Sequence, residues 1–182
     1  MKSNILTLVI ISAIFFSCQR DDICAEATPT TPQLIITFYD INNQDEPKAA
    51  RQLEVIGLDD NDSPLATPIF SRSTTDSIAI PLRFQEENKQ TISKFELLLN
   101  ADFDNDDDTT SSNTDKITIT YSPEFVYVSR ACGYKSIFYL DDNIPFSRDG
   151  QNQGDDNTWI KSFEINNQSV TNENEAHIFI YH

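Results

Sequence analysis

The sequence has little glycine, little positive charge and no apolar run long enough to cross a bilayer. Its 182 residues include four glycines, and 13 Lys and Arg stand against 29 Asp and Glu, for a formal net charge of −16 at pH 7. A charge of this sign repels phosphate groups and anionic lipid headgroups. We therefore expect no nucleic-acid partner, and a folded domain that stands off from the membrane surface.

The shortage of glycine also constrains the turns. A turn that requires a positive φ angle favours glycine first, and asparagine or aspartate next. With four glycines in the whole chain, most such turns must be built from Asn and Asp. Turn chemistry therefore explains part of the acidity.

Motifs of the common catalytic sites are missing as well. The sequence contains no G-x-S-x-G, no H-E-x-x-H and no glycine-rich phosphate-binding loop. Its two histidines are His177, which we expect at the surface or rim of a strand, and His182. We expect a non-catalytic protein. A hydrolase is the less favoured alternative, because two acidic side chains that converge in space suffice for a glycosidase.

The first 17 residues have the character of a secretory signal. Lys2 precedes an apolar run over residues 5–16, which is shorter than the roughly 20 residues of a membrane span. The run ends in Ser17 and Cys18, a small residue directly before a cysteine, which resembles the lipobox of bacterial lipoproteins. That resemblance implies that Cys18 is acylated, for example with palmitate, and becomes the mature N-terminus. An ordinary cleaved signal is the alternative.

The four residues after Cys18 are Gln19, Arg20, Asp21 and Asp22. They resemble the acidic surface-export signal of Bacteroidetes lipoproteins. The resemblance implies an outer-membrane lipoprotein that is exposed at the cell surface and contacts the membrane through its lipid. An acidic start of the tether also arises by chance in a chain this acidic.

The rest of the chain divides into a tether and one domain. Residues 18–33 include Pro29 and Pro32 and lack an apolar period, which indicates an extended tether. Residues 34–182 are enough for one domain with a single core. After Cys18 the cysteines are Cys24 and Cys132, an even pair that favours a disulfide in an oxidising compartment. Two free buried thiols, or pairing of Cys24 with a second copy, are the alternatives.

Short alternating runs separated by Asn- and Asp-rich turns extend through residues 34–182. The alternation has the period of two that is typical of strands, and no apolar stripe of helical period extends over three turns. Residues 125–128 and 134–140 are apolar on both faces, and Pro81 should end a strand or place it at an edge. The pattern predicts an all-β fold, an antiparallel two-sheet sandwich of about eight strands. An eight-stranded barrel is the alternative.

One acidic loop has the oxygen spacing of a calcium site. Counted from Asp104, oxygen-bearing side chains stand at positions 1, 3, 5, 7, 9 and 12, among them Asp106, Asp108 and Asp115. Thr109 stands where the EF-hand loop needs glycine, so a solvated acidic connection between strands is the favoured interpretation. No other cofactor is expected. Trp159 follows a polar loop and is expected at the edge of the core, with a sugar-stacking role as the alternative.

Several segments in this order resemble an uncharacterised lipoprotein family of Bacteroidetes, especially flavobacteria. They are residues 18–22, the cysteine at position 24, the tether, residues 34–40 (LIITFYD) and residues 129–135 (SRACGYK). The resemblance implies location and fold and transfers no catalytic residue. We expect an exported accessory or structural protein of the envelope. A surface module that binds a glycan or an envelope protein is the alternative, and a row of exposed aromatic side chains would be its sign.

Overall fold

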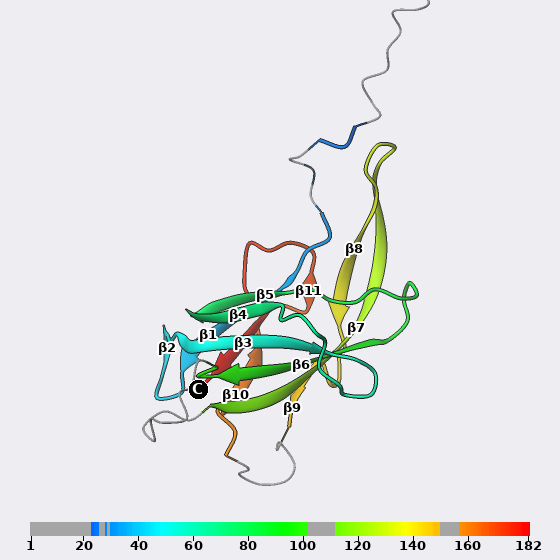
Figure 1. Cartoon of the computed structure of the whole chain (residues 1–182). Helices are drawn as coiled ribbons and strands as arrows, with labels where there is room; N and C mark the ends of the chain where they lie inside the picture. Colours follow the sequence, from blue (N-terminus) through cyan, green and yellow to red (C-terminus); the bar gives the residue numbers. More distant parts are fainter. Residues whose placement is uncertain (1–22, 26–27, 29, 102–111, 150–156) are drawn as a thin grey trace, which may run out of the picture.

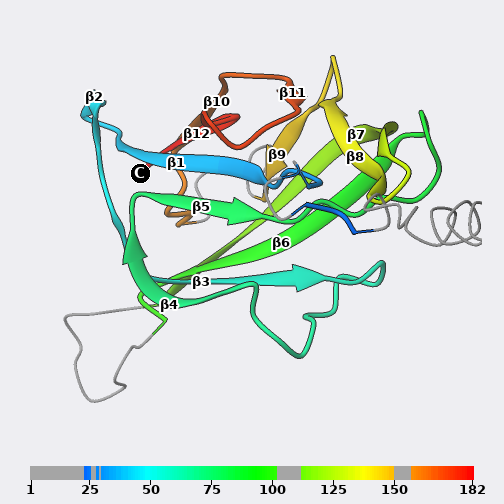
Figure 2. The ribbon, with the colours of Figure 1, turned by 90° about the horizontal axis from the view of Figure 1, so that it is seen from above.

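The computed structural model describes residues 23–25, 28, 30–101, 112–149 and 157–182 (Figure 1). Within these ranges the regular structure is entirely β, in two mostly antiparallel sheets of five and seven strands. No helix in the described ranges has the length and apolar character needed to cross a membrane. The two sheets face each other as the layers of a sandwich (Figure 2).

The five-stranded sheet has the order β10-β12-β1-β2, and β5 also pairs with β1. Its members are β1 (Leu34–Asp40), β2 (Asn43–Pro47), β5 (Ser77–Ile80), β10 (Ser162–Ile165) and β12 (Ile178–Tyr181). The pair β1 and β12 is parallel, with Ile36 opposite Ile178, and the other pairs are antiparallel. Strand β5 ends directly before Pro81, as predicted, because proline cannot donate a hydrogen bond to the next strand.

The seven-stranded sheet has the order β11-β8-β7-β6-β3-β4, with β9 paired to β7. Its members are β3 (Ala50–Leu58), β4 (Phe70–Thr75), β6 (Thr91–Leu99), β7 (Asn113–Ser129), β8 (Gly133–Leu140), β9 (Phe146–Arg148) and β11 (Ser169–Val170). Strand β7 is 17 residues long. Its first half pairs with β6 and β9, and its second half pairs with β8 alone.

Alternate residues of both sheets point inward and form one hydrophobic core. On β1 the buried positions are Leu34, Ile36 and Phe38, which are separated by half-buried residues. This period of two follows from the pleat, which sends successive side chains to opposite faces. The largest fully buried side chains come from both sheets: Tyr121, Phe38, Phe138, Leu34, Ile36, Leu53, Ile80, Leu97, Ile117, Ile119, Ile160 and Ile178.

The turns use asparagine and aspartate where a positive φ angle is needed. Asp62, Asn88, Asn100 and Asn157 all have positive φ. The shortage of glycine predicts this substitution, since Asn and Asp tolerate the left-handed region better than most other residues.

The predicted sandwich is confirmed, and the described strands do not close into the alternative barrel. The predicted number of about eight strands is too low, because the structure contains short strands such as β9 and β11 that carry too few residues to show an alternating pattern. Strands β10 and β12 pair with each other, with Ser162 opposite Tyr181. Between them the chain leaves this sheet and forms β11 on the other.

Candidate functional site

The most distinctive surface of the described chain is a projecting β-hairpin, residues 125–136, which we call the hairpin arm. It contains the end of β7, a tight turn and the start of β8, with Tyr127 opposite Tyr134. Strand β6 begins at Thr91, opposite Tyr121, so the later residues of β7 have no β6 partner. The hairpin arm therefore extends beyond the body of the sandwich (Figure 1).

A three-residue turn joins the two strands of the arm. Ser129 pairs with Gly133, and the Cys132 amide donates a hydrogen bond to Ser129 Oγ at 3.1 Å. Gly133 has φ of 71°, and a Cβ added there would meet no atom within 4 Å. Glycine is therefore required by the backbone conformation.

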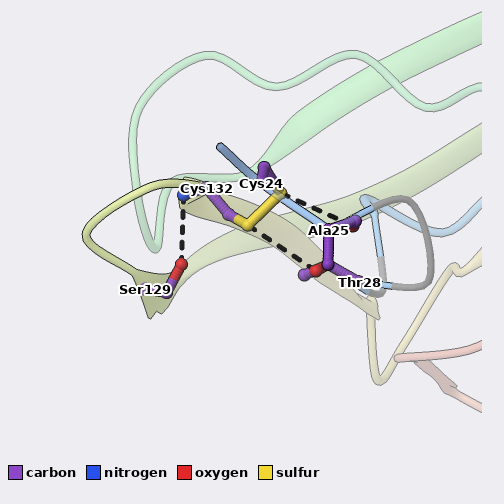
Figure 3. Close-up of a disulfide and its surroundings, with 5 residues drawn as sticks. All are labelled: Cys24, Ala25, Thr28, Ser129 and Cys132. Carbon is purple, nitrogen blue, oxygen red and sulfur yellow. Dashed lines mark hydrogen bonds between the residues drawn. A yellow bond between two sulfur atoms is a disulfide. The ribbon is translucent and has the colours of Figure 1, made fainter. Parts of the chain in front are cut away.

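A disulfide ties the N-terminal segment to this turn. Cys24 and Cys132 are bonded at 2.00 Å, with their Cα atoms 4.8 Å apart (Figure 3). Further along the same segment, Thr28 Oγ1 lies 3.6 Å from Cys132 Sγ, and Thr31 Oγ1 accepts a hydrogen bond from the Ser136 amide at 2.9 Å. The predicted pairing of Cys24 with Cys132 is thus present, and the segment follows the outer edge of β8.

The hairpin arm exposes two tyrosines. Tyr127 is 59% exposed and Tyr134 is 70% exposed, and their rings meet edge to face with centroids 5.4 Å apart. Opposing residues and every second residue share a face, so this pair continues the face that carries buried Tyr121 and Phe138. The two tyrosines therefore extend the core face of the seven-stranded sheet. Among the described residues, the five-stranded sheet does not cover them.

A neighbouring segment packs against the base of the arm. The loop after β5 packs on the free edge of β7, where the Phe125 amide donates to Glu87 Oε1 at 3.1 Å and the Asn88 amide donates to the Pro123 carbonyl at 2.8 Å. Phe84 packs edge-on against Phe125 at 6.4 Å between centroids, and it is itself mostly exposed. Exposed aromatic side chains therefore extend from the base of the arm towards its turn.

The charge of the arm differs from that of the chain. Residues 125–136 contain Arg130 and Lys135 and no acidic residue, whereas the whole chain has a net charge of −16. Beside the disulfide lies a surface hollow of about 440 Å³, lined by Ile23, Ala25, Thr28 and the turn of the arm. The side chain of Ile23 is 84% exposed. The arm thus joins apolar, aromatic and basic groups at one end of the molecule.

Most of the residues predicted to carry function lie outside the described ranges. These residues are Cys18, Gln19, Arg20, Asp21, Asp22, Asp104, Asp106 and Asp108. Asp115 is described: it lies on β7, is 1% exposed, and its Oδ2 accepts a hydrogen bond from the Ile160 amide at 2.7 Å. In the described part of the chain, no three His, Cys, Asp or Glu residues are placed to hold a metal ion.

Calcium ligation by Asp104, Asp106, Asp108 and Asp115 stays a prediction. If the loop binds calcium, millimolar calcium should raise the melting temperature, because a ligand that binds only the folded state stabilises it. Sodium chloride at matched ionic strength is the control, since it screens repulsion between the carboxylates without ligation. Equal shifts in the two salts, measured by calorimetry, would leave a solvated loop.

Glu54 and Asp115 are both buried carboxylates, and they do not form a catalytic pair. Asp115 lies opposite Leu97 on β6, and Leu97 lies opposite Val55 on β3, so these three share a face. Glu54 precedes Val55 and therefore points to the other face, where it pairs with Arg72 Nε at 3.2 Å. A sheet separates the two carboxylates, whereas a glycosidase needs both beside one bond.

The histidines and the tryptophan take structural positions. His177 is fully buried, so its predicted surface position is wrong; its Nδ1 accepts a hydrogen bond from the Ile35 amide at 2.9 Å. Burial lowers the pKa of His177 and of His182, which favours their neutral forms. Trp159 is 6% exposed and donates from Nε1 to the Leu97 carbonyl at 3.1 Å. It belongs to the core, as expected, and cannot stack on a sugar.

No motif in the sequence predicts the exposed tyrosine pair. Residues 125–128 and 134–140 are apolar on both faces, and this pattern does not distinguish the projecting half of a strand from its buried half. The one available signal in the sequence is the length of the apolar run. The apolar and β-branched character of β7 continues past the position at which β6 begins, and only the pairing register reveals the difference.

Most of the chain matches one protein family. Residues 52–182 match the model of a family of unknown function, DUF6452. The chain belongs to the DUF6452 family. The matched region contains Cys132 and the whole hairpin arm, and it begins after Cys24 and β1. No curated protein and no solved structure matches the chain.

Proposed function

We propose that this member of the DUF6452 family is an exported, lipid-anchored accessory protein of the outer membrane, displayed at the cell surface and without catalytic activity. The observation that carries the proposal is the disulfide between Cys24 and Cys132. Such bonds persist in oxidising compartments, which supports export. The bond also connects the folded domain to the segment that begins at Cys18, the residue that we propose is acylated.

The signal-like residues 1–17 and the cysteine at position 18 support the same location. A non-catalytic role is supported by the placement of the chemistry-bearing groups. Glu54 and Asp115 point to opposite faces of the sheet, and His177 is enclosed in the core. These groups serve the fold, and none of the three is directed toward a shared cleft.

A second candidate function is a surface module that binds a glycan or an envelope protein. The exposed pair Tyr127 and Tyr134 favours it, since tyrosine supplies a large contact area with a polar end and is enriched at binding surfaces. Titration of the purified protein with surface glycans and membrane extracts tests this candidate. Binding that survives replacement of both tyrosines by serine would contradict it.

Surface display is tested by replacing Arg20, Asp21 and Asp22 with alanine. The variant should keep its acyl chains but lose accessibility to protease and antibody on intact cells, because the proposed export signal is removed while Cys18 stays. Replacement of Gln44, Asp45 and Glu46 with alanine on the exposed strand β2 is the matched control. Equal accessibility of the signal variant and the unaltered protein would overturn surface export by this signal.

A further inference from the structure

We propose that the turn of the hairpin arm rests in the headgroup layer of the membrane that holds the protein, with Ile23, Tyr127 and Tyr134 as its contacts. The inference rests on the proposed function, because it requires acylation of Cys18. It goes beyond that function by assigning an orientation and a lipid-contacting site. It also replaces the expectation, based on total charge, that the domain stands off from the membrane.

The tether between the anchor and the disulfide is short. Five residues, 19–23, separate Cys18 from Cys24. Six steps of at most about 3.6 Å limit the distance between these two cysteines to about 20 Å. The disulfide places the Cα of Cys132 4.8 Å from that of Cys24. The turn of the arm must therefore stay close to the bilayer, while the rest of the domain has no such limit.

The exposed side chains of the arm have the chemistry of a membrane interface. Tyr127 and Tyr134 are amphipathic aromatic residues, which are enriched at the level of the lipid headgroups. Ile23 adds an exposed apolar side chain on the segment between the anchor and the disulfide. In water this apolar surface is uncovered, and contact with the lipid interface would remove part of it from water.

Charge is distributed unevenly between the arm and the rest of the chain. The arm itself carries Arg130 and Lys135 and no acidic residue, so its own side chains complement anionic headgroups. The body of the chain is strongly acidic and is repelled by the same headgroups. Attraction at one end and repulsion at the other therefore orient the domain with its arm toward the membrane and β2 away from it (Figure 1).

A lipid surface suits the arm better than a second copy of the chain. Two copies would bring together two strongly acidic domains, which repel each other. In every anchored molecule the short tether holds the arm beside lipid. Contact with a protein would require that partner in addition. The experiment must distinguish contact with lipid from contact with a membrane-embedded protein partner.

The test uses the full acylated protein, isotope-labelled and inserted into nanodiscs that contain anionic lipid. Mass spectrometry first establishes acylation of Cys18. A gadolinium chelate on the lipid headgroups then weakens the amide NMR signals of nearby residues. Signals of Tyr127, Ala131 and Tyr134 should be lost more strongly than those of Asn43 and Glu46 in β2, at the far end of the sandwich.

Two variants sharpen the test. Replacing Tyr127 and Tyr134 with serine should reduce the signal loss at the arm, because the tether remains but the interfacial contacts are gone. Tyr139→Ser is the matched control, since Tyr139 lies on β8 but on the other face, opposite Ser122. Retention of the disulfide and of the amide spectrum of β6 shows that each variant is folded.

The outcomes are distinct. Acylated protein whose arm and β2 lose signal equally would overturn the inference and leave the proposed function intact, with the arm free for a protein partner. Arm signals that are unchanged by the double tyrosine substitution would show that the tether alone sets the orientation, which would overturn the contact site. Absence of acylation would overturn the proposed function, and the inference would fall with it.

Discussion

Cys18→Ala should abolish acylation and move the protein from the membrane fraction to the soluble fraction. An acyl chain contributes about 0.8 kcal/mol of membrane-binding free energy for each CH₂ group that it buries. One chain binds marginally and reversibly, and a second chain makes the anchoring stable. In the described ranges no helix can take over this role. We therefore propose that the lipid on Cys18 alone provides stable attachment to the membrane. Incorporation of labelled palmitate and fractionation of the membranes measure the two effects.

The chain supplies its own matched control for this experiment. Replacing Cys24 and Cys132 with serine removes the other two cysteines, and this variant should remain acylated and membrane-bound. It thereby separates the loss of one particular thiol from a general effect of cysteine substitution. If Cys18→Ala leaves the membrane partition unchanged, the lipoprotein interpretation is wrong.

The same double substitution, Cys24→Ser with Cys132→Ser, should lower the free energy of unfolding by about 2–5 kcal/mol. The bond closes a loop across a sequence separation of 108 residues, so its loss frees a large part of the unfolded chain. The expected loss is a large share of the roughly 5–15 kcal/mol by which domains are stable. Urea unfolding followed by circular dichroism measures it.

Reduction of the unaltered protein is the control for the loss in stability. It should produce the same shift in the unfolding midpoint without any substitution. Digestion of the oxidised protein should also yield one linked pair of peptides, containing Cys24 and Cys132. Two free thiols in the native protein, or a dimer that reductant dissolves, would contradict the intramolecular bond.

The disulfide also affects the orientation of the domain. Without it, the segment before β1 would be free to extend, and the reach from Cys18 to the sandwich would grow by the length of residues 24–33. Proline-containing segments of this kind are extended, at about 3.1 Å per residue. Removal of the bond would therefore lower the stability of the domain and release its orientation at the membrane, while the anchor at Cys18 would still hold the protein there.

The exposed aromatic pair shows where a local pattern stops being informative. Tyr121 and Tyr127 occupy equivalent positions of one alternating strand, yet Tyr121 is buried and Tyr127 is exposed. The difference depends on which strands reach each position. Strand β6 begins opposite Tyr121, so beyond that residue β7 pairs with β8 alone, and the side chain of Tyr127 is exposed.

His177 shows the same limit in the opposite direction. A lone polar residue near the end of a chain is usually found at the surface, and we expected it there. The parallel pairing of β12 with β1 instead brings its Nδ1 to the Ile35 amide, which compensates part of the cost of burial. That pairing joins segments that are more than 140 residues apart in sequence.

The sequence by itself determined the features that depend on neighbours along the chain. An alternation with period two requires an all-β fold, asparagine and aspartate replace glycine in the turns, and Pro81 ends its strand. An even pair of cysteines indicated the disulfide. Each of these follows from the conformational limits or the chemistry of the residue types themselves.

Only the tertiary structure decided the features that depend on register between distant segments. These are the parallel pairing of β1 with β12, the burial of His177, the separation of Glu54 from Asp115, and the exposure of Tyr127 and Tyr134. Alternation assigns a side chain to one of two faces, but it does not say which strand lies beside it or how far that strand extends. The hairpin arm projects because β7 is longer than its pairing with β6, and that mismatch exists only once the strands have paired.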